Sequence, residues 1–326
     1  MNRHNRSIAS LAVIVLAGLS LAVPQWAPAQ SVSPQYSIID VPFSSPIFGY
    51  STSATGINDR GQIVGSYVSD VHYGFAYTLS GFVYDHGVYT SFDVPGTPSF
   101  GVNQTYANGI NNLGQIIGSY YDSDPEWGDV LRGFLYDHGV ITTLSPPDVN
   151  GLETQARGIN DRGQIVGFYF DLNFTIRGFM YDHGVYTHID FPGAVDTRAF
   201  GINNRGEIVG FYYDSNWHAH VFLYDHGAYT VLEDPAAAYS DPSINPLGIN
   251  DRGQIVGSDF DDHFVAHGFL YDHGVYTRFD APNAGVSLNN YSGTFATGIN
   301  ARGEIVGYAF GKKGPPAFVL SRSGSI

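Results

Sequence analysis

The sequence predicts an all-β fold, a six-bladed β-propeller of four-stranded blades that is closed by an N-terminal strand completing the last blade. Three observations lead to this prediction. The tripeptide Gly-Ile-Asn recurs six times, each copy opens a unit with four short runs rich in β-branched and aromatic residues, and the last unit lacks a run that stands alone near the N-terminus. The copies begin at residues 56, 109, 158, 201, 248 and 298.

Each unit has its elements in the same order. Ala-x-Gly-Ile-Asn comes first and x-x-Gly-Gln/Glu-Ile-Val/Ile-Gly follows; a variable stretch then leads to Gly-Phe-x-Tyr-Asp-His-Gly and finally to Val-Tyr-Thr-x-Phe/Ile-Asp-x-Pro. Four strands in roughly fifty residues are typical of one propeller blade. The chain is predicted to be a single propeller domain over residues 30–326. The expected blades are residues 54–94, 107–145, 156–191, 199–234, 246–281, and 296–320 with 36–42.

Two recurring turns can be typed. The segments 58–61 (Asn-Asp-Arg-Gly) and 84–87 (Tyr-Asp-His-Gly) place glycine fourth, as a type I turn followed by a left-handed glycine bulge requires. The histidines of the second turn are therefore expected to be exposed turn residues. They would lie roughly 10 Å or more apart on neighbouring blades, whereas metal ligands lie about 2 Å from one ion, so no shared metal site is expected. They are His86, His138, His183, His226 and His273.

The two ends of the chain complement each other. The sixth unit stops after Ala317-Phe318-Val319-Leu320, and the strand it lacks stands alone as residues 36–42. Pairing the two would close a ring and leave no bare sheet edge, whereas an open solenoid would need polar capping units, which are absent. The N-terminal strand would then be outermost and Ala-x-Gly-Ile-Asn innermost. The two typed turns would share one face of the disc, and the variable stretches would lie on the other.

The order of the repeated motifs resembles the bacterial extracellular HAF repeat family. Gly-Ile-Asn-x-x-Gly-Gln-Ile-Val-Gly alternates with triplets such as His267-Gly268-Phe269 and Arg132-Gly133-Phe134, from Tyr36 to about Leu320. The His-Ala-Phe triplet itself occurs only as variants. The resemblance implies an exported repeat protein and adds no catalytic residue.

The N-terminus predicts export. Arg3 and Arg6 precede an apolar run from about Leu11 to Val23, and small residues end at Ala29, which is typical of a signal peptide over residues 1–29 cut after Ala29. The mature chain is expected to be secreted or periplasmic, without stable membrane insertion, and monomeric. The net charge of −15, which becomes −17 once the two arginines are removed, argues against nucleic-acid binding. Because there is no cysteine, stability must come from packing.

The variable stretches supply the candidate ligand-binding residues. Aromatic rings stand beside carboxylates there, a combination in which rings stack on a saccharide or aromatic ligand and carboxylates accept its hydrogen bonds. The alternative is structural, with aromatic residues ending the strand and aspartate bonding its own turn. The candidates are Tyr120, Tyr121, Asp122, Asp124, Trp127, Tyr169, Phe170, Asp171, Tyr212, Tyr213, Asp214, Trp217, Asp261, Asp262 and His263.

No cofactor is expected. Asp122-Ser123-Asp124 alternates oxygen donors as a calcium site does, but it lacks the further ligands and the fixed glycine of a twelve-residue calcium loop. Motifs for nucleophilic, zinc or phosphate chemistry are also missing. We therefore expect a non-enzymatic propeller that binds an extracellular carbohydrate or protein. The alternatives are a hydrolase or lyase acting on a polysaccharide or lactone, and a structural envelope protein.

Overall fold

The computed structural model describes residues 25–26, 35–39, 41–42, 52–71, 77–96, 98, 103–147, 149, 153–232, 244–282, 284, 293–310 and 317–321. Apart from residues 25–26, the expected signal peptide lies outside this set, as does Asp40 of the expected N-terminal strand. The described elements are all strands, and the part of the chain they cover contains no helix long and apolar enough to cross a bilayer.

The predicted all-β propeller of four-stranded blades is confirmed. Blade one is β3 (Thr52–Ile57), β4 (Ile63–Val71), β5 (Tyr77–Asp85) and β6 (Val88–Phe92), and blade two is β7 (Thr105–Ile110), β8 (Ile116–Asp124), β9 (Gly128–Asp137) and β10 (Val140–Leu144). Blade three is β11 (Thr154–Ile159), β12 (Ile165–Phe170), β13 (Ile176–Asp182) and β14 (Val185–His188), and blade four is β15 (Asp196–Ile202), β16 (Ile208–Tyr213), β17 (Ala219–Asp225) and β18 (Ala228–Leu232). Within each blade, neighbouring strands are antiparallel and joined in chain order.

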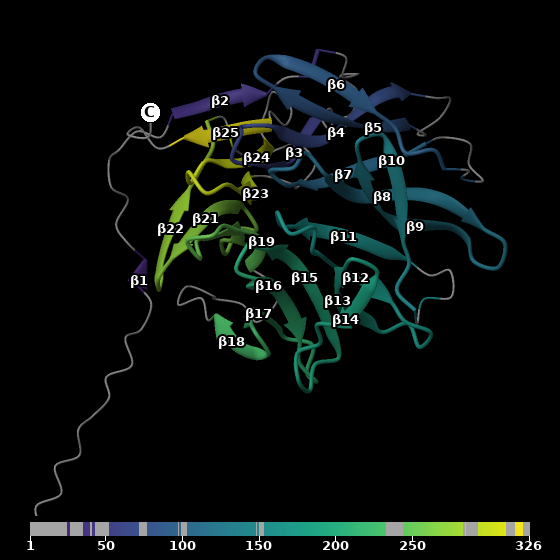
Figure 1. Ribbon diagram of the computed structural model, residues 1–326. Helices are drawn as coiled ribbons and strands as arrows, with labels where there is room; N and C mark the ends of the chain where they lie inside the picture. Colours follow the sequence, from purple (N-terminus) through teal and green to yellow (C-terminus); the bar gives the residue numbers. More distant parts are fainter. Residues whose placement is uncertain are drawn as a thin grey trace, which may run out of the picture.

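Blades five and six share one sheet because a single parallel bridge joins Ala266 to Gly293. Blade five is β19 (Ile244–Ile249), β20 (Ile255–Phe260), β21 (Ala266–Asp272) and β22 (Val275–Phe279), with the short β1 (Gln25–Trp26) beside β22. Blade six is β23 (Gly293–Ile299), β24 (Ile305–Phe310) and β25 (Ala317–Ser321), and β2 (Gln35–Ile39) pairs antiparallel with β25 (Figure 1).

The first strand of each blade is innermost. In Figure 1, β3, β7, β11, β15, β19 and β23 surround the centre, and each contacts the next around the ring. Their glycines permit this approach: a Cβ on Gly56 would lie 2.9 Å from the Cα of Gly109. The innermost position of Ala-x-Gly-Ile-Asn follows from this crowding.

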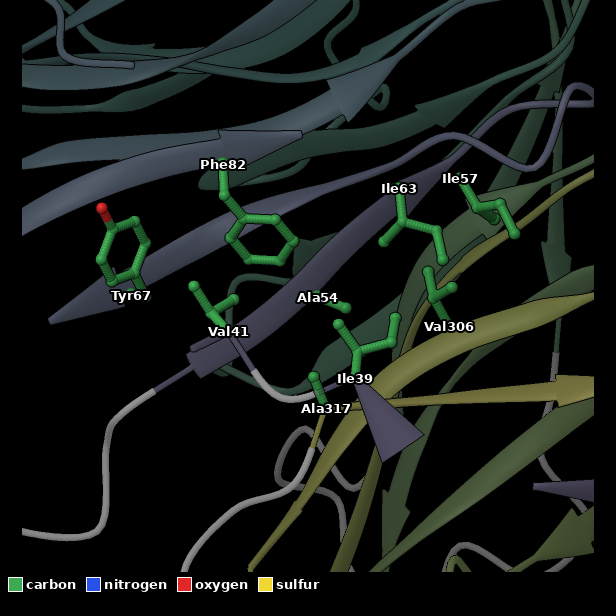
Figure 2. Packing of buried hydrophobic residues seen from close by; sticks show 9 residues of the cluster. All are labelled: Ile39, Val41, Ala54, Ile57, Ile63, Tyr67, Phe82, Val306 and Ala317. Atoms are coloured by element: carbon green, nitrogen blue, oxygen red, sulfur yellow. The ribbon is translucent and has the colours of Figure 1, made fainter. Parts of the chain in front are cut away.

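Apolar side chains fill the spaces between neighbouring blades. Between blades six and one, Ile39 and Val41 pack with Ala54 of β3 and Ala317 of β25 (Figure 2). The third strand places one buried phenylalanine in each blade, preceded by glycine in four blades, by Val221 in blade four and by Ala317 in blade six. The phenylalanines are Phe82, Phe134, Phe179, Phe222, Phe269 and Phe318.

The asparagine that follows each innermost strand organises the first turn. The backbone N–H of Gly61 donates to the Asn58 carbonyl (3.1 Å), and the Asn58 side-chain oxygen accepts from the backbone N–H of Arg60 and of Gln62 (both 3.0 Å). Gly61 has φ +79°, so the predicted glycine bulge is present. The Asn58 amide also donates to the Asn111 carbonyl of the next blade (3.0 Å). The same bond recurs from each blade to the next, ending with Asn300 to Asn58 (3.2 Å).

The next residue of each turn adds an outer belt of hydrogen bonds. Asn112 donates to carboxylate oxygens of Asp59 (2.8 Å) and Asp161 (2.9 Å), and Asn204 donates to Asp161 (2.8 Å) and Asp251 (3.0 Å). Acid and amide therefore alternate around the ring, with alanine at the sixth place. The belt and the Ile-Asn pairs line a central pocket of about 70 Å³.

The Asp-His-Gly turn differs from the type predicted. Asp85 and Val88 are paired, so the loop has two residues, and both have positive φ, His86 at +46° and Gly87 at +89°. Two left-handed central residues define a type I′ turn, whose twist suits a tight hairpin. Glycine in the fourth position fits either type, and only the strand pairing distinguishes them. The Asp85 carboxylate fixes the loop by accepting from His86 Nδ1 (2.5 Å) and Gln62 Nε2 (2.9 Å).

Candidate functional site

The turns between the second and third strands lie on the face opposite the asparagine and Asp-His-Gly turns, because the strands run antiparallel in chain order. In blades three to five they have one geometry. The backbone N–H of Phe174 donates to the Asp171 carbonyl (2.9 Å), and the Asp171 carboxylate accepts from the backbone N–H of Asn173 (2.8 Å) and of Thr175 (2.9 Å). We call these the aromatic turns. They are residues 171–175, 214–218 and 261–265.

Each aromatic turn holds one exposed aromatic ring in a left-handed backbone conformation. Phe174, Trp217 and Phe264 have φ of +60°, +62° and +60°. They are 63%, 66% and 73% exposed. A bulky side chain costs roughly 1–2 kcal/mol in this region, so it persists only where the surrounding structure enforces it.

The chain itself provides the comparison. The asparagine turns have the same hydrogen-bond pattern, and their left-handed position is always glycine, as at Gly163 in blade three and Gly206 in blade four. Turn geometry alone therefore selects glycine. The aromatic turns keep a large apolar side chain at this position although it is neither buried nor favoured by the backbone. Strain of this kind is characteristic of functional sites.

The capping aspartates hold the turns firmly. Desolvation raises the pKa of Asp171, but bonds from the backbone of Thr175 and Asn173 and from Arg177 (3.2 Å) outweigh it, so the net shift is downward. The pKa of Asp214 is lowered chiefly by the backbone N–H of His218. Desolvation also raises the pKa of Asp261, but hydrogen bonds from the backbone and from His267 outweigh it, so this pKa too is lowered. All three caps are therefore ionised at neutral pH.

His267 links the blade-five turn to the outer strand. Its Nδ1 contacts the Asp280 carboxylate (2.9 Å) and its Nε2 faces Asp261 (3.5 Å). The hydrogen bond to Asp280 raises the pKa of His267, burial opposes the shift, and Asp261 and Asp259 add to it. The protonated imidazole is thus stabilised between acids, which strengthens the turn as the pH falls through neutrality.

Three of the predicted ligand-binding rings are part of the core. Tyr120, Tyr169 and Tyr212 are buried, and Tyr212 stacks on Phe191 with 3.7 Å between ring centroids. Their partners in sequence, Tyr121, Phe170 and Tyr213, lie on the other side of the strand and are partly buried.

The predicted blade-two residues form a longer hairpin. Asp122 and Asp124 pair with Arg132 (3.4 and 2.9 Å), and Asp124 also accepts from the backbone N–H of Glu126 and of Trp127. These carboxylates are thus engaged by the protein. Glycine holds the left-handed position here, at Gly128. The Trp127 ring contacts Phe174 of blade three edge-on at 5.8 Å, so aromatic contact continues between the two blades.

At the blade-five turn, Asp261, Asp262 and His263 each offer a metal-ligand atom within 4.8 Å of the others. Asp261 caps the turn, and Asp262 pairs with His263 (2.7 Å) on the surface. The turn itself accounts for this grouping.

Sequence reasoning found Trp217 and Trp127 but missed Phe174 and Phe264. The available signal was an aromatic residue three places after the aspartate in three consecutive units. Its meaning depends on a positive φ, which the pattern of residue types does not reveal.

No protein-family model and no curated protein matches this sequence. Solved structures share its architecture. AofleA from Arthrobotrys oligospora is 13% identical, with 93% of this chain and 90% of that chain covered and a TM-score of 0.51. A protein of unknown function from Dyadobacter fermentans is 11% identical, with 87% and 96% covered and a TM-score of 0.53. The six-bladed fucose-recognising lectin of Aleuria aurantia is 14% identical, with 68% and 74% covered and a TM-score of 0.43. At these identities the likeness establishes the β-propeller fold alone.

Proposed function

We propose that this chain is an exported, non-enzymatic binding protein that holds a saccharide against the aromatic turns of blades three to five. The observation that carries the proposal is the exposed aromatic residue at the left-handed position of each of these turns, where the asparagine turns, with the same hydrogen-bond pattern, have glycine. Loops on a rigid frame commonly carry binding sites. The basic and apolar N-terminal sequence and the resemblance to HAF repeats support export.

The form of the site favours a saccharide over a protein partner. Phe174, Trp217 and Phe264 project from three separate blades, and Phe174 has Trp127 edge-on beside it while Trp217 has Tyr213 beside it, so each blade presents an aromatic surface of the size of a sugar ring. A ring fixed by its own backbone can stack on the apolar face of a sugar, and exposed polar groups such as Asp262 and His263 can bond its hydroxyls.

A glycan array followed by calorimetry on the best polysaccharide tests this proposal. Phe174→Ala, Trp217→Ala and Phe264→Ala should each weaken binding about tenfold, since an aromatic anchor contributes about 1.4 kcal/mol or more. Val140→Ala and Val185→Ala are the controls, because both side chains are 64% exposed and lie on the opposite face. Unchanged binding by the triple alanine variant would contradict the site. Release of sugar fragments during incubation would contradict a non-enzymatic role.

A further inference from the structure

We infer that the centre of the propeller contains a second site, in which Arg157 binds the carboxylate of an acidic ligand. Arg157 belongs to β11, the innermost strand of blade three, two residues before Ile159 of the central pocket. The inference that the ligand has a carboxylate rests on the contacts of Arg157 itself. Only the assignment of the ligand as an acidic saccharide rests on the proposed function.

Arg157 occupies a position at which every innermost strand has a β-bulge. The register shifts between Ala156 and Gly158, and it shifts at the equivalent step of the other five blades. Bulges turn a side chain out of the regular pleat. At this position, Thr55 and Asn108 donate to the carbonyl of the neighbouring innermost strand, at 2.6 and 2.8 Å. A short donor therefore suffices there, and the length of Arg157 exceeds what the architecture requires.

Aromatic rings surround the guanidinium. The Arg157 Cζ lies 5.4 Å from the centroid of Phe168 and 5.6 Å from that of Phe200, and a second arginine, Arg198, lies 5.4 Å from Phe168 and from Phe211. The three rings are buried. Cation–π contacts offset part of the cost of removing a guanidinium from water, but they do not replace its hydrogen bonds.

The two arginines differ in their counter-charge. Arg198 makes two bonds to the Asp196 carboxylate, from Nε (3.2 Å) and Nη2 (2.9 Å). Arg157 donates from Nη2 to the Gln155 side chain, and its Nε is buried with no hydrogen-bond partner among the described residues. None of the ion pairs found in the described part of the chain includes Arg157.

Burial lowers the pKa of Arg157 to about 10, while Glu153 raises it and Arg198 lowers it further. The group is thus still charged at neutral pH, and a buried guanidinium whose Nε has no acceptor among the described residues is costly. A ligand carboxylate would supply the missing acceptor. The planar fork of a guanidinium matches a carboxylate in geometry and in charge.

An aromatic path connects this position with the aromatic turns. Phe211 contacts Tyr213 (5.7 Å), and Tyr213 contacts the exposed Trp217 (5.9 Å). The innermost strands begin on the face that carries the aromatic turns, and Arg157 lies within β11 between that face and the central pocket. One acidic oligosaccharide with its carboxylate at Arg157 and a neutral unit on Trp217 would use both.

The test compares D-galacturonate with neutral D-galactose on the full purified protein, followed by thermal unfolding and calorimetry at increasing sugar concentration. We expect galacturonate to raise the Tm saturably, by about 2 °C or more, and galactose at equal concentration to have no such effect. Arg157→Met, which keeps the length and apolar contacts, should abolish the galacturonate shift. Arg205→Met is the control, because Arg205 is an exposed turn residue on the opposite face paired with Glu207.

Three outcomes would overturn the inference: equal shifts with the two sugars, an equal shift with sodium sulfate, or an undiminished shift in Arg157→Met. The wild-type comparison of the sugars is decisive even if the variant does not fold. The alanine variants of Phe174, Trp217 and Phe264 separate the two proposals. Loss of neutral polysaccharide binding tests the aromatic turns, whereas the galacturonate shift of the same variants tests Arg157.

Discussion

Trp217 adopts a left-handed backbone conformation that the asparagine turns on the opposite face assign to glycine. Its φ is +62°, and Gly206, in the equivalent turn of the same blade, has φ +87°. Because Trp217 is largely exposed, it gains little burial in return for this strain. The side chain therefore costs the folded state free energy that its packing does not recover.

A glycine at this position should make the protein more stable and a poorer binder. We expect Trp217→Gly to raise the free energy of unfolding in urea by about 0.5–1 kcal/mol, because relief of the left-handed strain exceeds the added entropy of the unfolded chain. Gly206→Ala, the inverse change, should lower it by about 1 kcal/mol. A loss of stability in Trp217→Gly would show that the ring is structural and would remove the main support for the site.

At the scale of single elements, the asparagine turns combine a local turn with a link between blades. Asn160 is buried, accepts from the backbone N–H of Arg162 and Gln164, and donates to the Asn203 carbonyl of the next blade. One side chain thus fixes its own turn and joins two blades.

Asn160→Ala would leave three backbone groups without their partner: the N–H of Arg162, the N–H of Gln164 and the buried Asn203 carbonyl. We expect it to lower the free energy of unfolding by about 2–4 kcal/mol, measured by urea denaturation. Arg162→Ala, an exposed change in the same turn, should stay within about 0.5 kcal/mol. A similar small effect of both substitutions would mean that the turn does not depend on the ring of asparagine bonds.

The elements also mark the limit of sequence reasoning. The asparagine turn could be typed because the asparagine side chain accepts the backbone N–H groups of the turn and the glycine adopts its positive φ. The Asp-His-Gly turn could not, because His86 tolerates a positive φ that only the pairing of Asp85 with Val88 imposes. In the same way, Tyr120 and Tyr121 are alike in sequence, and only the strand register shows that Tyr120 faces the core.

At the scale of the whole molecule, the repeats alone predicted the architecture. Six copies of one unit leave few alternatives, since each unit must cover its apolar faces with its neighbours. That the N-terminal strand closes the ring stays a prediction, and the pairing of β2 with β25 makes it testable residue by residue.

Two neighbouring isoleucines of β2 provide that test. Ile39 is 4% exposed and belongs to the cluster between blades six and one, whereas Ile38 is 64% exposed. Ile39→Ala should lower the free energy of unfolding by about 2–4 kcal/mol, and Ile38→Ala should change it by about 0.5 kcal/mol or less. Equal effects in thermal and urea unfolding would indicate that this strand does not hold the first and last blades together.

The belt of aspartate and asparagine that lines the central pocket has a consequence for how such a ring can gain blades. Asp59, Asn112, Asp161, Asn204 and Asp251 alternate in kind, and Ala301 occupies the place where another amide would fit. Aspartate and asparagine can alternate from blade to blade around a closed ring only when the number of blades is even. Gain or loss of one blade within the run from Asp59 to Asp251 would place two carboxylates or two amides side by side, so this run favours duplication in steps of two.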